Sequence, residues 1–257
     1  MTPHERRHQG RGIPRRLRAV LFDLDDTLYP EKAFVDGGFR AVARFLAERV
    51  PRSEADLADR LWALHAIEGR GRLFDTLLEE LGVDHDVDLV LACLLVYRSH
   101  PIALEPFPGV HSTLAELRTA GVRTGLVSDG HAAVQRRKLA GLGSIAARLD
   151  VVVMTDELGP AYAKPSPMAF RVACRILDVP PSLTTYVGND PRKDFLGARE
   201  AGLHTIRLGN LPDEGGTMDV QFGAADDADI IVGSFHELSA AVRQAAAEID
   251  APQAVAR

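Results

Sequence analysis

Cysteines and long apolar segments are both scarce in this sequence. Cys93 and Cys174 are its two cysteines, and their wide separation matches neither a disulfide framework nor the close spacing of zinc ligands. The longest apolar stretch, residues 89–97, is far shorter than the roughly 20 residues that cross a bilayer, so it predicts a buried helix. The first residues are basic but lack the apolar segment of a secretory signal. We therefore expect a cytoplasmic protein that does not enter a membrane.

The sequence also lacks an excess of positive charge. Its formal net charge is -6 at pH 7, whereas nucleic acids and anionic membranes attract basic surfaces. We expect neither as a partner, which leaves small molecules as the expected ligands. At 257 residues and 46% hydrophobic content, the chain is long enough for one well-buried core and a second, smaller unit.

Short apolar runs rich in β-branched residues alternate with helical patterns over much of the chain. Strands that are apolar throughout are covered on both faces, which is typical of a parallel sheet between two layers of helices. The sequence thus predicts an α/β fold with a doubly wound parallel sheet. The expected strands are residues 19–22, 123–127, 149–154, 184–187, 205–208 and 229–232, and the expected helices are 110–120, 132–142, 167–177 and 194–201.

Residues 31–105 interrupt this alternation. They contain no convincing strand and show four stretches with apolar residues at helical spacing, so we predict an all-helical insertion there. Prolines flank it, and proline ends helices and stiffens connections. The predicted domains are a flexible basic arm (1–18), an α/β core (19–30 and 106–240), the helical insertion (31–105) and a C-terminal helix and tail (241–257).

Polar residues follow four of the expected strands. The carboxyl ends of parallel strands form the edge at which open α/β sheets bind ligands, so side chains that come directly after the strands are expected to meet there. The segments LFDLDDT, LVSDG, AKPSP and VGNDPRKD supply these side chains. They contribute Asp23, Asp25, Thr27, Ser128, Asp129, Lys164, Asn189, Asp190 and Asp194.

Three carboxylates crowd into four positions, at Asp23, Asp25 and Asp26, although like charges repel. A hard divalent cation relieves this repulsion, and Mg²⁺ prefers oxygen ligands that include water and substrate phosphate. A transferring phosphoryl group also needs its outer oxygens held, which suits the hydroxyl of Ser128 and the ammonium of Lys164. One aspartate attacks phosphorus, and a second acid two residues away protonates the leaving oxygen and later activates water. The pattern therefore indicates magnesium-dependent phosphoryl transfer to a carboxylate.

In the order DLDDT, LVSDG, AKPSP and GNDPRKD, these motifs resemble those of the haloacid dehalogenase superfamily, in the phosphatase subgroup with a helical cap inserted after the first strand. The resemblance covers residues 19–232. It implies that Asp23 is the nucleophile, that Asp25 is the general acid and base, and that Asp23 and the backbone carbonyl of Asp25 bind Mg²⁺. It also implies a phosphate-binding group that contains Thr27, Ser128, Asp129 and Lys164.

The fourth motif departs from the family pattern. That motif most often reads Gly-Asp, and the aspartate reaches the metal, whereas this sequence has Asn189 in that position and Asp190 next to it. Either Asn189 binds the metal through its neutral amide oxygen, or Asp190 binds it while Asp194 orients the metal shell from behind. We favour Asp190 as the ligand.

The expected reaction is hydrolysis of a small phosphate monoester. Dehalogenases of the resembling superfamily lack the second aspartate of the DxD motif, so Asp25 argues against cleavage of a carbon–halogen bond. A phosphomutase would keep both aspartates and stays an alternative. A non-catalytic binding module is disfavoured, because binding alone does not require a nucleophile paired with an acid. Sugar phosphates, phosphoglycolate-like acids and nucleoside monophosphates are all compatible substrates.

The helical insertion is expected to choose the substrate, because a closing cap excludes water and presents its own side chains to the leaving group. Its segment EGRGR, residues 68–72, places glycines on both sides of Arg70. Glycines let a loop approach a ligand closely, and Arg70 and Arg72 suit a distal carboxylate or a second phosphate. The alternative is an ordinary turn between two helices with solvated arginines.

Overall fold

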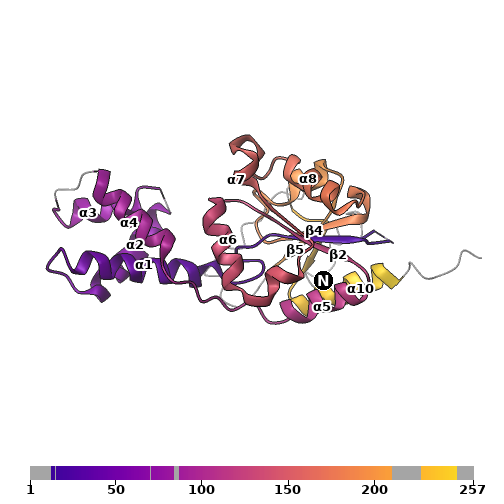
Figure 1. Cartoon of the computed structure of the whole chain (residues 1–257), viewed down its shortest axis with the longest axis horizontal. Coiled ribbons are helices and arrows are strands. Elements are labelled where there is room, and N and C mark those ends of the chain that lie inside the picture. The colour runs from indigo at the N-terminus through magenta and orange to yellow at the C-terminus, as the bar shows by residue number, and fades with distance from the viewer. Residues whose placement is uncertain (1–12, 15, 70, 84–86, 210–226, 248–257) are drawn as a thin grey trace, which may run out of the picture. The chain divides into compact units, whose positions relative to one another are not determined.

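The structure is a computed structural model that describes residues 13–14, 16–69, 71–83, 87–209 and 227–247 (Figure 1). Most of the predicted basic arm and the last part of the predicted tail lie outside these residues. The chain divides into two compact units, one formed by Met1–Pro30 with Glu105–Arg257 and the other by Glu31–Leu104. We call them the α/β unit and the helical unit.

The α/β unit is built on one parallel six-stranded sheet with the order β3-β2-β1-β4-β5-β6. β1 pairs with β2 on one side and with β4 on the other, so that Leu21 lies between Gly125 and Tyr186. The connections therefore turn in opposite directions at β1 and β4, and such a switch point is where an open α/β sheet binds its ligand. The strands are β1 (Ala19–Phe22), β2 (Arg123–Ser128), β3 (Val151–Met154), β4 (Thr184–Gly188), β5 (His204–Leu208) and β6 (Ile230–Val232).

Helices cover both faces of this sheet, which confirms the predicted doubly wound fold. In Figure 1, α5 and α10 lie on one face and α8 on the other. The central strands β1 and β4 are buried on both faces, as expected of a parallel sheet between two layers of helices. The helices are α5 (Val110–Thr119), α6 (Ala132–Gly141), α7 (Thr155–Leu158), α8 (Met168–Leu177), α9 (Phe195–Glu200) and α10 (Phe235–Ala247), with 3-10 turns at Gly143–Arg148, Pro160–Tyr162 and Pro181–Leu183.

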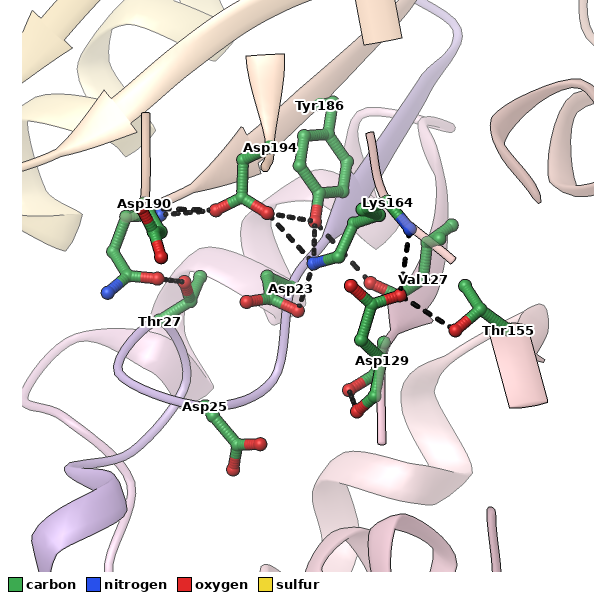
Figure 2. Close-up of polar contacts among 12 residues, drawn as sticks. Asp23, Asp25, Thr27, Val127, Asp129, Thr155, Lys164, Tyr186, Asp190 and Asp194 are labelled. Carbon is green, nitrogen blue, oxygen red and sulfur yellow. Dashed lines mark hydrogen bonds and ion pairs between the residues drawn. The ribbon is translucent and has the colours of Figure 1, made fainter. Parts of the chain in front are cut away.

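The core between the sheet and α8 is filled by large apolar side chains. Phe170 of α8 meets the ring of Tyr186 edge-on, with centroids 4.8 Å apart, and Phe195 of α9 is fully buried in the same cluster. Tyr186 points its hydroxyl toward the carboxyl end of the sheet (Figure 2). This packing holds one polar group of the site from within the core.

The helical unit consists of α1 (Glu31–Ala47), α2 (Glu54–Glu68), α3 (Leu73–Glu80) and α4 (Val87–Ser99). Ser53 caps α2, because its hydroxyl accepts a hydrogen bond from the backbone N–H of Asp56. The unit has its own core, in which Phe39 of α1, Leu61 of α2 and Cys93 of α4 are buried together. It therefore buries apolar side chains independently of the sheet.

Residues 89–97 form part of helix α4, as predicted, but the prediction that this helix is buried was wrong. Cys93 is the one fully buried residue of α4, and exposure reaches 73% at Val87, 47% at Leu91 and 65% at Leu95. These three residues are spaced by four, so they share one face of the helix. An apolar run shows that a helix has an inner face, but its composition does not say how many faces are covered. None of the described helices is long and apolar enough to cross a membrane.

Candidate active site

The carboxyl end of the sheet gathers the residues that sequence analysis singled out. Asp23 directly follows β1, Ser128 ends β2, and Lys164 comes from the segment after β3. Figure 2 shows Asp23, Lys164, Asp194 and Tyr186 converging on one another. The topology therefore brings side chains that are far apart in sequence to one edge.

Asp23 is a buried carboxylate, and one of its two oxygens accepts a hydrogen bond. Its side chain is 2% exposed, and its Oδ1 accepts a hydrogen bond from Lys164 Nζ at 2.7 Å. Its Oδ2 is buried without a hydrogen-bond partner in the structure. Burial raises the pKa of Asp23 to about 6, even though the charge of Lys164 works in the opposite direction. A buried carboxylate oxygen without a partner is costly, so this oxygen is available for a ligand.

Lys164 is the cation at the centre of the site. Its ammonium is completely buried and donates to Asp23, to Asp194 Oδ1 at 2.8 Å and to Tyr186 Oη at 3.0 Å. Burial alone would lower the pKa of Lys164, but the charges of Asp194 and Asp23 hold this pKa well above its ordinary value. The lysine therefore stays charged and fixed in direction by three oxygen partners.

Asp194 supports the site from behind and also holds the loop after β4. Its Oδ2 accepts the backbone N–H groups of Asn189 at 3.1 Å and Asp190 at 2.9 Å. This contact needs a glycine at position 188, because a Cβ atom there would lie 2.5 Å from Asp194 Oδ2. The predicted role of Asp194 as an orienting residue agrees with this geometry and stays a prediction.

Asn189 and Asp190, the two candidate metal ligands, have different surroundings. The amide oxygen of Asn189 accepts a hydrogen bond from the buried hydroxyl of Thr27 at 3.3 Å. Both carboxylate oxygens of Asp190 accept from Arg192, at 2.8 Å each. Burial raises the pKa of Asp190, but the hydrogen bonds and charge of Arg192 outweigh burial and the net pKa is lowered. Asn189 thus lies against the β1 loop, while the structure directs Asp190 to a surface arginine.

Asp129, predicted in the phosphate-binding group, directs its carboxylate into the α/β unit. Its Oδ1 accepts the hydroxyl of Thr155 at 2.7 Å and the backbone N–H of Lys164 at 3.1 Å. Figure 2 shows both contacts. This carboxylate therefore fixes the segment that carries Lys164.

Asp25 is surrounded by donors that sequence analysis did not identify. Lys138 Nζ lies 2.9 Å from Asp25 Oδ1 and 3.1 Å from Oδ2. Gln135 Nε2 donates to Asp25 Oδ2 at 2.8 Å and to Ser128 Oγ at 2.8 Å, and the hydroxyl of Tyr29 donates to Oδ1. Burial would raise the pKa of Asp25, but Lys138 and these hydrogen bonds together hold it below its ordinary value.

Of the two arginines proposed for substrate choice, the structure describes Arg72. Arg70 lies outside the described residues. Arg72 precedes α3, its side chain is 71% exposed, and it pairs with Glu79 at 2.9 Å. This is the environment of a solvated arginine at an ordinary turn.

A comparison with protein families identifies the family of this chain. The model of the haloacid dehalogenase-like hydrolase family matches residues 17–202, which is more than half of the chain and includes every residue of the site described above. The chain belongs to this family.

Curated relatives of this hydrolase include phosphatases. It is 37% identical to the glyceraldehyde 3-phosphate phosphatase of Methanopyrus kandleri, over 75% of this chain and 84% of the relative. It is 32% identical to the phosphoserine phosphatase of Thermus thermophilus, over 74% of this chain and 88% of the relative. A haloacid dehalogenase superfamily phosphatase from Thermococcus onnurineus has the same fold, with a TM-score of 0.59, 23% identity and coverage of 88% and 98% of the two chains.

The oxygen donors of this haloacid dehalogenase-like hydrolase fit a hard divalent cation. Asp23 Oδ2 is a buried carboxylate oxygen without a hydrogen-bond partner, and Asn189 adds a neutral amide oxygen near Thr27. Within the described ranges, no three His, Cys, Asp or Glu side chains gather as a metal cluster. Mg²⁺ needs no such cluster, since it usually binds one or two carboxylates and completes its shell with water and substrate phosphate.

Sequence analysis of this hydrolase missed Tyr186, Gln135 and Lys138. Tyr186 lies inside β4, before the strand end at which the polar motif residues gather, so no motif marks it. Lys138 follows Arg136 and Arg137, and composition alone does not separate a buried lysine from two more accessible arginines. A usable signal was the helical spacing, because Gln135 and Lys138 share a face with the buried Leu139 and Leu142.

Proposed function

We propose that this haloacid dehalogenase-like hydrolase is a magnesium-dependent phosphatase that hydrolyses a small phosphate monoester through an aspartyl phosphate on Asp23. The observation that carries the proposal is the pairing at the end of β1. Asp23 is buried with one oxygen free of protein partners, and Asp25, two residues on, is held separately by Lys138 and Gln135. A nucleophile and a proton-transfer group are thus placed side by side in the chain.

The proposed first step transfers the phosphoryl group to Asp23. An Asp23 oxygen forms a bond to phosphorus while the bond from phosphorus to the ester oxygen breaks, and that oxygen takes a proton from Asp25. The pKa of Asp25 is low at rest, so Asp25 starts ionised. A phosphate anion beside it raises this pKa, because like charges disfavour ionisation, and Asp25 binds the proton together with the substrate.

The proposed second step releases inorganic phosphate. Asp25 takes a proton from water, the water oxygen bonds to phosphorus, and the bond between phosphorus and Asp23 breaks. Lys164 and Ser128 hold the outer phosphoryl oxygens in both steps. Both are buried, and Lys164 donates to a phosphoryl oxygen in place of one of its three protein oxygens.

Mg²⁺ would be held by Asp23 Oδ2, the backbone carbonyl of Asp25 and the amide oxygen of Asn189, with Asp194 orienting the loop. Asn189 replaces Asp190, the ligand that the sequence favoured, because both carboxylate oxygens of Asp190 accept from Arg192. When bound, it supplies a positive charge that screens the phosphate from Asp23 and stabilises the transferring group. The neutral Asn189 replaces a carboxylate, so the protein part of this site carries less negative charge than the usual family site. Substrate phosphate would then provide a larger share of the negative charge around the metal.

We propose that the helical unit acts as the cap that selects the substrate. Its separate core and its insertion directly after the β1 loop support this role. The named activities of the two curated phosphatases make glyceraldehyde 3-phosphate and phosphoserine the first compounds to test. Release of inorganic phosphate would distinguish a phosphatase from a phosphomutase, which returns an isomeric phosphate ester.

The deciding experiment compares Asp23→Asn with the wild-type protein on p-nitrophenyl phosphate and the two named compounds, with and without EDTA. We expect the wild type to release phosphate only with Mg²⁺, and Asp23→Asn to lose at least about 100-fold in kcat, because an amide does not replace the nucleophile. Asp178→Asn is the matched control. Asp178 is an exposed residue with φ 53, a conformation that asparagine also adopts. Near-native turnover of Asp23→Asn would exclude the proposed mechanism.

A further inference from the structure

Helix α6 directs two polar side chains, Gln135 and Lys138, at Asp25. Gln135 and Lys138 are three residues apart and so lie on one helix face. Both are almost completely buried, with 2% and 3% exposure, while Arg136 on another face is 53% exposed and pairs with Glu157. A buried lysine is rare and needs a compensating charge, so the placement of Lys138 calls for an explanation.

The compensating charge is Asp25. Lys138 Nζ approaches both Asp25 oxygens, at 2.9 and 3.1 Å, and the lysine side chain is 4% exposed against 16% for Asp25. Gln135 adds a donor to Oδ2, and Tyr29 adds one to Oδ1. Donors on both oxygens fix the plane of the carboxylate as well as its place.

Gln135 also connects Asp25 with the phosphate-binding side of the site. The same amide nitrogen donates to Asp25 Oδ2 and to Ser128 Oγ, at 2.8 Å in each case. Because Gln135 occupies an acceptor position of the Ser128 hydroxyl, the O–H of Ser128 is left to point to another acceptor. One side chain of α6 therefore sets the distance between the phosphate holder and the proton-transfer group.

The arrangement gives each aspartate of the DxD motif its own lysine. Asp23 is paired with Lys164 and Asp25 with Lys138, at 2.7 and 2.9 Å. A buried ion pair that only anchored α6 would be a poor source of stability, because the desolvation of two charges offsets most of their attraction. Here the anchored carboxylate is the one that must meet the leaving oxygen.

We propose that Lys138 and Gln135 are positioning residues that hold the Asp25 carboxylate at the place where it exchanges a proton with the leaving oxygen. This inference rests on the proposed function, because it assumes that Asp25 transfers that proton. It predicts that substitution of these α6 residues slows the hydrolysis of an ester in proportion to how much its leaving oxygen needs protonation. Esters with a good leaving group need little protonation of the ester oxygen, whereas esters with a poor one depend on it.

The test measures kcat/KM for two aryl esters of similar shape, dinitrophenyl phosphate and phenyl phosphate. kcat/KM reports substrate binding and the steps up to release of the phenol, so it excludes the later hydrolysis of the aspartyl phosphate. For Lys138→Met we expect a loss of about 10- to 100-fold on phenyl phosphate, the range that misplacement of an acid produces. The same variant should be nearly unaffected on dinitrophenyl phosphate. Gln135→Ala should show a smaller loss with the same preference.

Two further variants separate a positioning role from a structural one. Asp25→Asn should show the same leaving-group preference more strongly, and the double variant Asp25→Asn/Lys138→Met should be no slower on phenyl phosphate than Asp25→Asn alone. Arg136→Met, on the same helix, should be unchanged on both substrates. Thermal melting of each variant reports folding, and if Lys138→Met does not fold, Gln135→Ala decides the question without removing a charge.

Equal losses on both esters, or multiplied losses in the double variant, would overturn the inference and leave Lys138 as an anchor of α6. In that case, a clear leaving-group preference in Asp25→Asn would still support the proposed function. If Asp25→Asn itself showed no preference, the role of Asp25 in the proposed function would be wrong and the inference would fall with it.

Discussion

At the scale of single residues, the site is a set of charges that compensate one another within the protein. The crowding of carboxylates after β1 suggested that a metal ion relieves their repulsion. The structure adds two buried ammonium groups, since Lys164 contacts Asp23 and Asp194 while Lys138 contacts Asp25. The aspartates are therefore partly neutralised before any ligand binds. A bound metal ion would satisfy Asp23 Oδ2, the Asp23 oxygen that Lys164 leaves without a partner.

The identity of the metal-binding residue after Gly188 is testable by a pair of substitutions. We expect Asn189→Asp to lower the half-saturating Mg²⁺ concentration about 10-fold or more, because a neutral ligand becomes charged. We expect Asp190→Asn to leave that concentration unchanged, because the Asp190 carboxylate faces Arg192. Phosphatase rates over a Mg²⁺ titration measure both values.

The opposite pattern would assign the metal to Asp190. It would consist of a higher Mg²⁺ requirement in Asp190→Asn and no gain in Asn189→Asp. Arg192→Ala serves as a control for the lost ion pair. Its side chain is 73% exposed, and an exposed pair contributes little stability.

How far the site could be predicted depends on whether a residue lies in a motif or on a helix face. Asp23, Ser128 and Lys164 follow strands, and parallel topology alone sends all strand ends to one edge. Lys138 reaches that edge across a helix, and only the packing of α6 decides which of its polar residues turns inward. Charge does not separate Arg136 from Lys138, and the local signal that does is helical spacing, which places Lys138 on the same face as the buried Leu142.

At the scale of elements, the strands were predictable to within about two residues because each is a short run rich in β-branched or apolar residues between helical patterns. The predicted strand at 19–22 coincides with β1, and that at 149–154 begins two residues before β3 (Val151–Met154). Helix α10 begins at Phe235, six residues before the predicted start of the C-terminal helix at 241. Its first turn packs against α5, where the hydroxyl of Thr113 donates to the carbonyl of Phe235. The extent of burial of α4 could not be predicted, because it depends on which neighbours cover the helix.

Helix α9 carries a contact that allows no side chain. A Cβ atom on Gly197 would lie 1.9 Å from the carbonyl oxygen of Pro165, in the segment that holds Lys164. Alanine normally stabilises a helix relative to glycine. Here we expect Gly197→Ala to destabilise the protein by about 1–3 kcal/mol through overpacking, and to lower kcat because the Lys164 segment must shift. Urea unfolding and phosphatase assays measure these effects.

The matched control is Gly233→Ala. A Cβ atom there would have its nearest contact at 3.7 Å, an ordinary separation. We expect unchanged activity and a stability near that of the wild type. Equal stability of Gly197→Ala and Gly233→Ala would show that the close approach of α9 to the Pro165 carbonyl is not a constraint on the fold.

At the scale of the whole molecule, the helical unit is an insertion whose two connections meet within the α/β unit. The backbone N–H of Phe107 donates to the carbonyl of Leu28 at 2.9 Å, so the chain leaves and returns at neighbouring points. The helical unit spans Glu31–Leu104 and buries its own core. The sheet therefore does not depend on the insertion for the pairing of its strands.

We expect a variant in which residues 31–104 are replaced by a short glycine-serine linker to fold into the α/β unit. Closing a short loop between neighbouring points costs little entropy, and Asp23, Lys164 and Asp194 keep all their mutual contacts because these lie within that unit. Circular dichroism should show a cooperative melt. Phosphate release from p-nitrophenyl phosphate should persist at a reduced rate, while discrimination among natural esters should be lost, because a cap supplies substrate contacts and excludes water.

Asp23→Asn in the same background controls for residual activity from contaminants. A variant that folds but retains the wild-type ranking of substrates would place specificity in the α/β unit, and Ser128, Asp25 and their partners on α6 would then be the residues to examine for it.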